Sequence, residues 1–276
     1  MKFFKLIKFD LCQGVFKQYG KFIIIFIFLI ISCLDFYVQL KAFYVTEYTY
    51  GHFLLYIFGG MKEYIPSPSE PFPVPYRWLL WHFLVLYFTL HYMHDDLTGF
   101  GQNLIYRCKS RTIWWISKCI WNVIYVSSFY IIGWITVFVF SVLCKAKMSF
   151  DITPIPMLLS FGEEQIISEH YNLLFQLTIL PLLVSIAVSL IQMTMSLIIK
   201  PMLSFVISAV IYISSAYKLV PWLLGNYAMA VRSDSTISNG INSKIGAIFS
   251  VLLSLCSIII GILLFKKYSI LNSKEA

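Results

Sequence analysis

The sequence predicts an all-α polytopic membrane protein, a single domain over residues 1–276 with six transmembrane helices. Hydrophobic residues make up 59% of the chain and charged residues only 12%, against about 25% charged residues in a soluble domain. The apolar residues gather in runs suited to crossing about 30 Å of hydrocarbon. Lys and Arg concentrate on one side of these runs, which is the asymmetry expected of an inserted protein.

The six spans are expected at about residues 22–40, 76–93, 119–143, 173–199, 202–217 and 245–265. Pro181 should kink the fourth span, and Lys266 and Lys267 end the sixth. If both termini lie on one side, that side holds 13 of the 21 Lys and Arg residues. The positive-inside rule therefore predicts that both termini are cytoplasmic.

The N-terminal stretch, residues 1–20, predicts an amphipathic helix. Its apolar residues, such as Phe4, Ile7 and Leu11, recur at helical spacing, while Lys5 and Lys8 fall mostly elsewhere. Such a helix lies in the headgroup region with its apolar face inward. It either anchors the topology only or also contacts a cytoplasmic partner.

A basic and aromatic segment separates the second and third spans. It is expected to form a short helix parallel to the membrane over residues 98–118, with Asp95 or Asp96 as its cap. Its basic residues would face the cytoplasm and its tryptophans would lie at the interface. An ordinary positive-inside loop is the alternative. The residues concerned are Arg107, Lys109, Arg111, Trp114, Trp115 and Lys118.

Three outer loops, residues 41–75, 145–172 and 218–244, are longer than simple connections. The prolines of the first, at 66, 68, 71, 73 and 75, favour polyproline II or an edge over a helix. The apolar front half of the third, residues 219–231, is too short to span alone. It is expected to pack between the fifth and sixth spans as an outer gate, or to rest on the surface as an amphipathic loop. The candidate gate residues are Pro221, Trp222, Gly225, Asn226, Tyr227 and Arg232.

Gly225 has a specific place in that prediction. A glycine inside an apolar segment marks a close approach of neighbouring backbone. Pro221 would break the segment from the fifth span and let the two move separately.

Other polar residues suggest chemistry only weakly. His91, His94, Asp95 and Asp96 form an HxxHDD pattern, with His82 on roughly the same side, but hydrogen bonding is the expected role and no metal site is predicted. Glu163 and Glu164 lack the arginine of the EExxxR motif found in intramembrane prenyl-protein endopeptidases. Asp35, near the outer end of the first span, is either a substrate-path residue or an interfacial one.

Two further patterns limit the function. The six cysteines show no CxxC pair, and no GxxxxGK[ST] phosphate loop occurs, so the chain does not hydrolyse ATP by that route. The basic residues flank membrane spans, so lipid headgroups or a cytoplasmic protein are expected as their partners rather than nucleic acid.

The order of these parts resembles an ABC-2-type permease, the membrane subunit of an ABC exporter, along nearly the whole chain. Such permeases have an interfacial N-terminal helix, six spans, a cytoplasmic coupling helix between spans two and three, and an extended outer segment before span six. The strongest local likenesses are RCKSRTIWWISK at residues 107–118 and PWLLGNYAMAVR at residues 221–232. The second is similar to the outer segment of permeases that export, or confer immunity to, bacterial peptides such as lantibiotics and phenol-soluble modulins.

The resemblance implies a permease half in a bacterial plasma membrane. Two copies, or this chain and a paralogue, would each bind an ATPase subunit that carries ATP and Mg, with no cofactor in this chain and no covalent chemistry of its own. The substrate would be an amphipathic peptide or a lipid-like molecule. A stand-alone immunity or sensor protein, or an intramembrane protease, is the alternative.

Overall fold

The computed structural model describes residues 3–66, 71–99, 110–153, 171–237 and 240–267. The longer helices are α1 (Phe3–Gly14), α2 (Tyr19–Ala42), α3 (Tyr50–Phe58), α4 (Tyr76–Leu90), α5 (Tyr92–Thr98), α7 (Arg111–Leu143), α10 (Ile179–Met195), α11 (Pro201–Tyr217) and α12 (Ser243–Lys267). The shorter elements are η1 (Phe16–Gln18), α9 (Leu174–Leu177), η2 (Leu224–Ala228), η3 (Ala230–Arg232) and the paired strands β1 (Asp151–Ile152) and β2 (Tyr171–Asn172).

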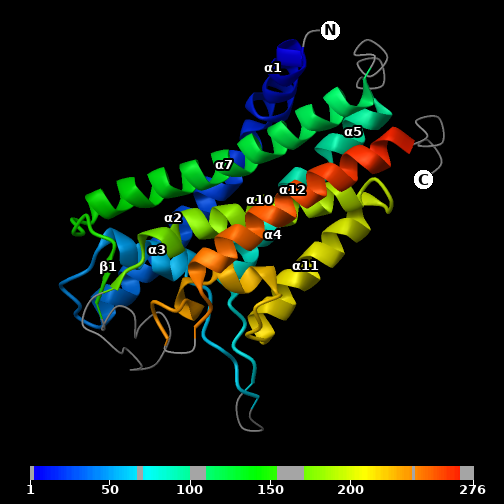
Figure 1. Cartoon of the computed structure of the whole chain (residues 1–276). Helices are drawn as coiled ribbons and strands as arrows, with labels where there is room; N and C mark the ends of the chain where they lie inside the picture. Colours follow the sequence, from blue (N-terminus) through cyan, green and yellow to red (C-terminus); the bar gives the residue numbers. More distant parts are fainter. Residues whose placement is uncertain (1–2, 67–70, 100–109, 154–170, 238–239, 268–276) are drawn as a thin grey trace.

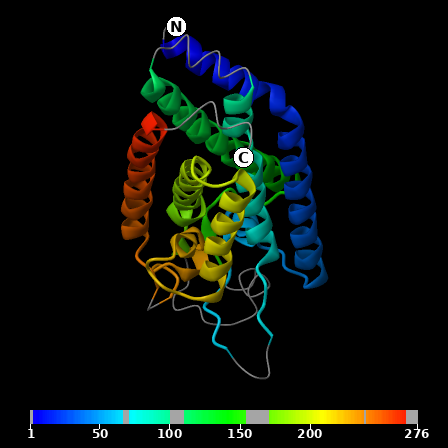
Figure 2. The same ribbon diagram turned by 90° about the vertical axis from the view of Figure 1, so that its right-hand side faces the viewer.

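The long helices form a bundle with two distinct ends (Figures 1 and 2). One end, called the terminal end below, holds α1, α5, the start of α7 and the last turns of α12. The opposite end, called the loop end, holds α3, β1 and the segments that join α3 to α4 and α11 to α12. The two ends of the bundle therefore carry the two sets of residues that the sequence singles out.

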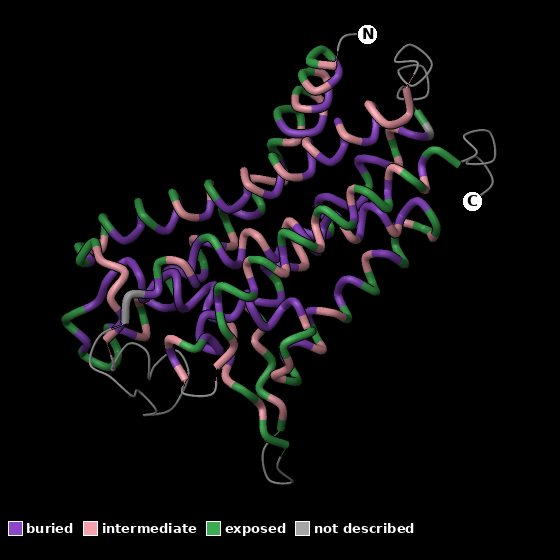
Figure 3. The backbone as a smooth tube through the Cα atoms, in the orientation of Figure 1, coloured by how far each residue is buried: buried purple, intermediate pink, exposed green. Residues whose placement is uncertain are grey.

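The surface of the bundle is that of a membrane-embedded protein. Four described helical stretches are long and apolar enough to cross a bilayer: Phe3–Ala42, Arg111–Leu143, Leu174–Met195 and Ser243–Lys267. On α12, Ile248, Leu252 and Ile259 are each more than half exposed, and Figure 3 shows such exposed positions along the outward side of the helices. Apolar exposure on this scale indicates contact with lipid.

Two of the six expected spans form shorter helices. α4 has 15 residues and α11 has 17, so at 1.5 Å per residue they measure roughly 23 and 26 Å. The bounds of α2, α11 and α12 agree with the predicted spans to within about three residues. The break expected at Pro181 lies three residues earlier, at Thr178 between α9 and α10, which leaves Pro181 in the first turn of α10 where its missing N–H is tolerated.

Small residues bring α12 against its neighbours. Gly246, Ser250, Ser257 and Gly261 are buried positions along one face of α12, and their small side chains let helix backbones approach closely. The Thr194 hydroxyl on α10 donates to the Ser257 carbonyl at 3.1 Å. The outer face of α12 is left to lipid.

One helix falls where a loop was expected. α3 lies inside the first predicted outer loop, and all nine of its residues are buried. Thr49 caps it: the hydroxyl accepts from the His52 N–H, and His52 Nδ1 accepts from the Thr49 N–H at 2.9 Å. This reciprocal capping box satisfies two backbone N–H groups and so defines the first residue of the helix.

Candidate functional site

Lys118 is the centre of a buried junction at the terminal end. Its Nζ lies 2.5 Å from Asp10 Oδ1 and 2.6 Å from Asp96 Oδ2. Asp10 comes from α1, Asp96 from α5 and Lys118 from α7, so one ammonium joins three helices. The Lys118 side chain has no exposed surface, which corrects the expectation that it faces the cytoplasm.

Further contacts complete this junction. The hydroxyl of Ser117 donates to Asp10 Oδ2, and that of Tyr92 donates to Asp10 Oδ1 at 3.1 Å. The Lys118 ammonium also lies 4.7 Å from the ring centroid of Tyr92 and 5.0 Å from that of Trp114. Because a buried charge is costly unless it is paired and hydrogen-bonded, this network fixes α1 against α5 and α7.

A glycine permits the close docking of α1. A Cβ atom at Gly14 would overlap the Trp121 side chain and lie 2.7 Å from ring atoms of Tyr92. The docked stripe is Leu6, Asp10 and Gly14. Among the apolar residues that define the predicted amphipathic helix, Phe4 is 78% exposed, whereas Leu11 packs against the core of the bundle.

The start of α7 is also tied to the end of α12. Arg111 Nη1 donates to the Lys266 carbonyl at 2.8 Å, at the negative end of the α12 dipole. Trp115 Nε1 donates to a backbone carbonyl of α12 at 3.1 Å. The ring of Trp114 stacks on Phe265 with centroids 4.7 Å apart. These contacts place both tryptophans in the bundle interior.

The geometry changes the expected shape of the basic segment. Arg111 begins a 33-residue helix that continues without a break to Leu143, so residues 111–118 are the first turns of α7 rather than part of a separate helix. Arg107 and Lys109 lie outside the described residues. Asp95 and Asp96, expected as helix caps, lie inside α5.

At the loop end, residues 224–233 form a buried segment, called the outer segment below after the side of the membrane on which the sequence predicts it. It contains η2 and η3 and packs against α10, α11 and α12. The alternative of an amphipathic surface loop is therefore wrong for these residues, although Pro221 and Trp222 just before them are exposed. Gly225 is closely packed, but its neighbours are side chains of α11 rather than the backbone that was expected: a Cβ there would lie 2.6 Å from the Ser215 hydroxyl and 3.1 Å from the Tyr212 ring.

Tyr227 and Asn226 fix the outer segment on both sides. A Cβ at Gly246 of α12 would overlap the Tyr227 ring, so the glycine makes room for the tyrosine. Asn226 Nδ2 donates to the carbonyls of Lys218 and Val220 at 2.9 and 3.0 Å, which ties the segment to the end of α11.

Arg232 holds the loop end together. Its guanidinium is fully buried and donates to five oxygens: the carbonyls of Met61 (2.8 Å), Lys62 (2.7 Å), Ala216 (2.7 Å) and Ser215, and Asn226 Oδ1 (2.5 Å). Burial lowers the pKa of Arg232 to about 10, so it stays charged at neutral pH. The two carbonyls from α11 belong to its last turn, where the helix dipole favours a cation.

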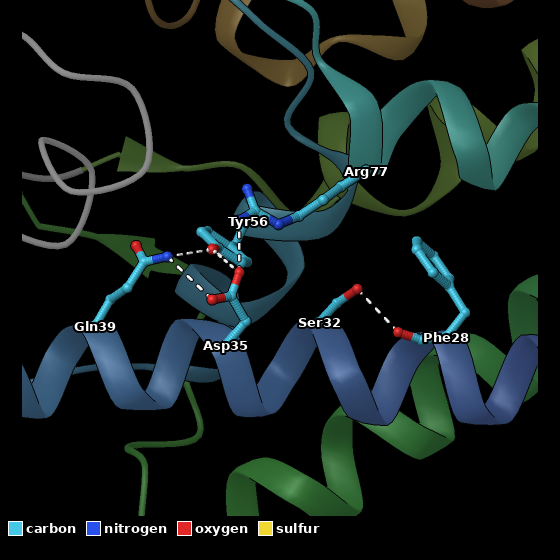
Figure 4. A network of polar contacts seen from close by, with 6 residues as sticks. All are labelled: Phe28, Ser32, Asp35, Gln39, Tyr56 and Arg77. Carbon is cyan, nitrogen blue, oxygen red and sulfur yellow. Dashed lines mark hydrogen bonds and ion pairs between the residues drawn. The ribbon is translucent and has the colours of Figure 1, made fainter.

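Asp35 belongs to a separate polar cluster that links α2 to α3 and α4 (Figure 4). Its Oδ2 accepts from Arg77 Nη2 and from the Tyr56 hydroxyl, each at 2.6 Å. Gln39 donates to the Tyr56 hydroxyl at 2.7 Å, and the Arg77 guanidinium lies 3.8 Å from the Tyr56 ring centroid. Asp35 is thus a paired carboxylate that joins helices.

The HxxHDD residues do not converge. In the described part of the chain, no three His, Cys, Asp or Glu side chains are arranged to hold a metal ion. Asp96 pairs with Lys118, and the His82 ring lies with its centroid 4.5 Å from those of both Trp78 and Tyr212. Glu163 and Glu164 lie outside the described residues.

The chain belongs to a family described as protein of unknown function (DUF2705), whose model matches residues 52–271. No curated protein and no solved structure matched the chain. The match covers nearly all of α3 and runs to the end of α12, and so includes the outer segment and all of the junction except α1.

Proposed function

We propose that this DUF2705 protein is the membrane-spanning permease subunit of an ABC exporter, driven by ATP hydrolysed on a separate ATPase subunit. The observation that carries the proposal is the junction around Lys118. It joins the N-terminal helix, the end of the second span and the start of the third at the end of the bundle where the chain termini lie (Figure 1). A soluble motor acting there would move several helices at once.

The long helix α7 would carry that movement to the opposite end. Its 33 residues measure about 50 Å at 1.5 Å per residue. Since Lys118, Trp114 and Trp115 are packed against α1, α5 and α12, a push near Arg111 would tilt α7 together with those helices. Rigid elements with packed ends are able to carry coupling of this kind.

The outer segment would close the exit of the substrate path. It packs against α10, α11 and α12, and Arg232 ties it to the last turn of α11. A tilt of α11 would therefore shift the segment. The substrate would be an amphipathic peptide or a lipid-like molecule, because a chain with 18% aromatic residues offers broad apolar contact rather than a few polar anchors.

In this proposal α2, α4, α7, α9–α10, α11 and α12 are the six spans, and the terminal end faces the cytoplasm of a bacterium. Cysteines at Ile65, in the loop between α3 and α4, and at Lys8, on the exposed side of α1, should then react with an impermeant maleimide from opposite sides. All six native cysteines would be replaced with alanine first. Labelling of both positions from one side would contradict the six-span topology.

The coupling role has its own test. Replacing Arg107, Lys109 and Arg111 with Glu should leave the protein inserted but abolish transport and the stimulation of a co-reconstituted ATPase. The reversed charge would repel the ATPase surface that Arg107 and Lys109 attract, and Glu at position 111 would also lose the hydrogen bond that ties α7 to the Lys266 carbonyl. The matched control is Glu at Lys145, Lys147 and Lys218, three basic residues of the loop end. Normal coupled activity in the first variant would contradict the coupling role.

A further inference from the structure

A cavity of about 500 Å³ opens at the loop end beside the outer segment. It lies between α9, the turn after η3 and the start of α12. The residues that line it are Phe175, Gln176, Asp234, Ser235, Asn242, Ser243 and Lys244. Its volume is within the range of sites that take small ligands, about 300–1,000 Å³.

Two opposite charges face this cavity. Asp234 and Lys244 are both exposed, and neither takes part in an ion pair within the described part of the chain. The Ser243 hydroxyl lies 3.4 Å from Asp234 Oδ1 and orients that carboxylate. The cavity therefore offers one anion and one cation that are able to meet a ligand.

The rest of the lining is ordered and mixed in character. Gln176 is buried and donates to the Ser235 hydroxyl at 2.8 Å. Asn242 Oδ1 accepts from the N–H groups at the start of α12, including that of Lys244 at 3.0 Å. Phe175 adds an apolar wall. These contacts hold the two charges on fixed elements.

We propose that this cavity binds a short zwitterionic peptide segment, with its ammonium at Asp234 and its carboxylate at Lys244. A ligand with only one sign of charge would meet one repulsive group, whereas a zwitterion satisfies both. The inference rests on the proposed function, because Asp234 and Ser235 of the cavity directly follow the outer segment, which ends at Ser233. A peptide leaving past that segment would enter the cavity.

The test measures binding to the purified chain in nanodiscs, without an ATPase. The probe is the tripeptide Ala-Phe-Ala with free ends, compared with its N-acetylated and its C-amidated forms. We expect each capped form, and each of the variants Asp234→Asn and Lys244→Gln, to bind roughly three- to fivefold more weakly, as the loss of one exposed ion pair implies. Glu47→Gln and Lys218→Gln, which alter charges away from the cavity, should leave binding unchanged.

Equal binding of the capped and free peptides would overturn the proposal, and so would unchanged binding in both cavity variants. Stronger binding of glycerophosphoethanolamine than of the peptide would also overturn it, and would assign the cavity to a lipid headgroup.

A charge exchange separates charge recognition from misfolding. The double variant Asp234→Lys with Lys244→Asp should bind the peptide more tightly than either single reversal. The binding assay contains no ATPase, so its result does not depend on transport. A chain that binds the peptide but supports no ATP-coupled transport in a separate assay would contradict the exporter function and leave the peptide site standing.

Discussion

Lys118→Met is expected to lower the free energy of unfolding by about 3–5 kcal/mol, the usual cost of removing one partner from a buried ion pair. Methionine keeps the apolar stem but removes the ammonium, so Asp10 and Asp96 are left buried without their shared counter-charge. We expect α1 to separate from α7 as a result. A cysteine at Leu6, which has no exposed surface in the docked helix, should then react with maleimide in the variant and stay protected in the parent.

The control variant is Lys8→Met, which removes an exposed ammonium from the other side of α1 and should change neither stability nor labelling. The double variant Asp10→Asn with Lys118→Met should cost less than the two single changes added together, since the neutral amide that replaces the Asp10 carboxylate needs no counter-charge. A Lys118→Met protein as stable as the parent, with Leu6→Cys protected, would mean that the ion pairs do not hold α1.

Arg232→Met is expected to be comparably damaging at the loop end. It removes the donor for five oxygens, four of them in fully buried contacts. A buried acceptor without a donor costs about 1–3 kcal/mol when no water reaches it. Since the surrounding oxygens relax and partly rehydrate, we expect a total loss of about 3–5 kcal/mol, measured as a fall of roughly 6–15 °C in Tm in detergent. A cysteine at Ala228, fully buried in the outer segment, should become reactive.

Arg232→Lys separates charge from geometry. Lysine keeps a cation at the end of α11 but has three donors on one atom instead of the planar fork, so we expect an intermediate Tm. Lys218→Met, an exposed change nearby, serves as the control. Equal stability of Arg232→Met and the parent, with Ala228→Cys unreactive, would show that the outer segment is held by apolar packing alone.

Hydropathy is sufficient to predict most of the helices. α2, α11 and α12 are apolar on nearly every side, so their bounds follow from composition and from flanking residues such as Lys266. The close packing at Gly225 is predictable for a similar local reason, because a glycine within a largely apolar stretch permits close approach of a neighbour. The helix α7 begins about eight residues before the predicted third span, since the charges of Arg111 and Lys118 are typical of a cytoplasmic loop.

The junction could not be predicted because its partners are distant in sequence. Asp10 and Lys118 are 108 residues apart, and neither has a local pattern that identifies the other. Two other features have a local pattern in the sequence. Arg232 directly follows an apolar stretch, and Thr49 with His52 marks the start of α3. A single charged residue beside an apolar stretch can therefore be buried and bonded inside the bundle as well as placed at the membrane interface.

The most direct test of the exporter function is purification of the tagged chain from its native membranes in a mild detergent, followed by identification of the proteins retained with it. We expect a stoichiometric ATPase with a GxxxxGK[ST] loop, retained by the parent and lost when Arg107, Lys109 and Arg111 are replaced with Glu. A chain that purifies free of any ATPase, and still performs its cellular role when ATPase partners encoded nearby are deleted, would contradict the permease function.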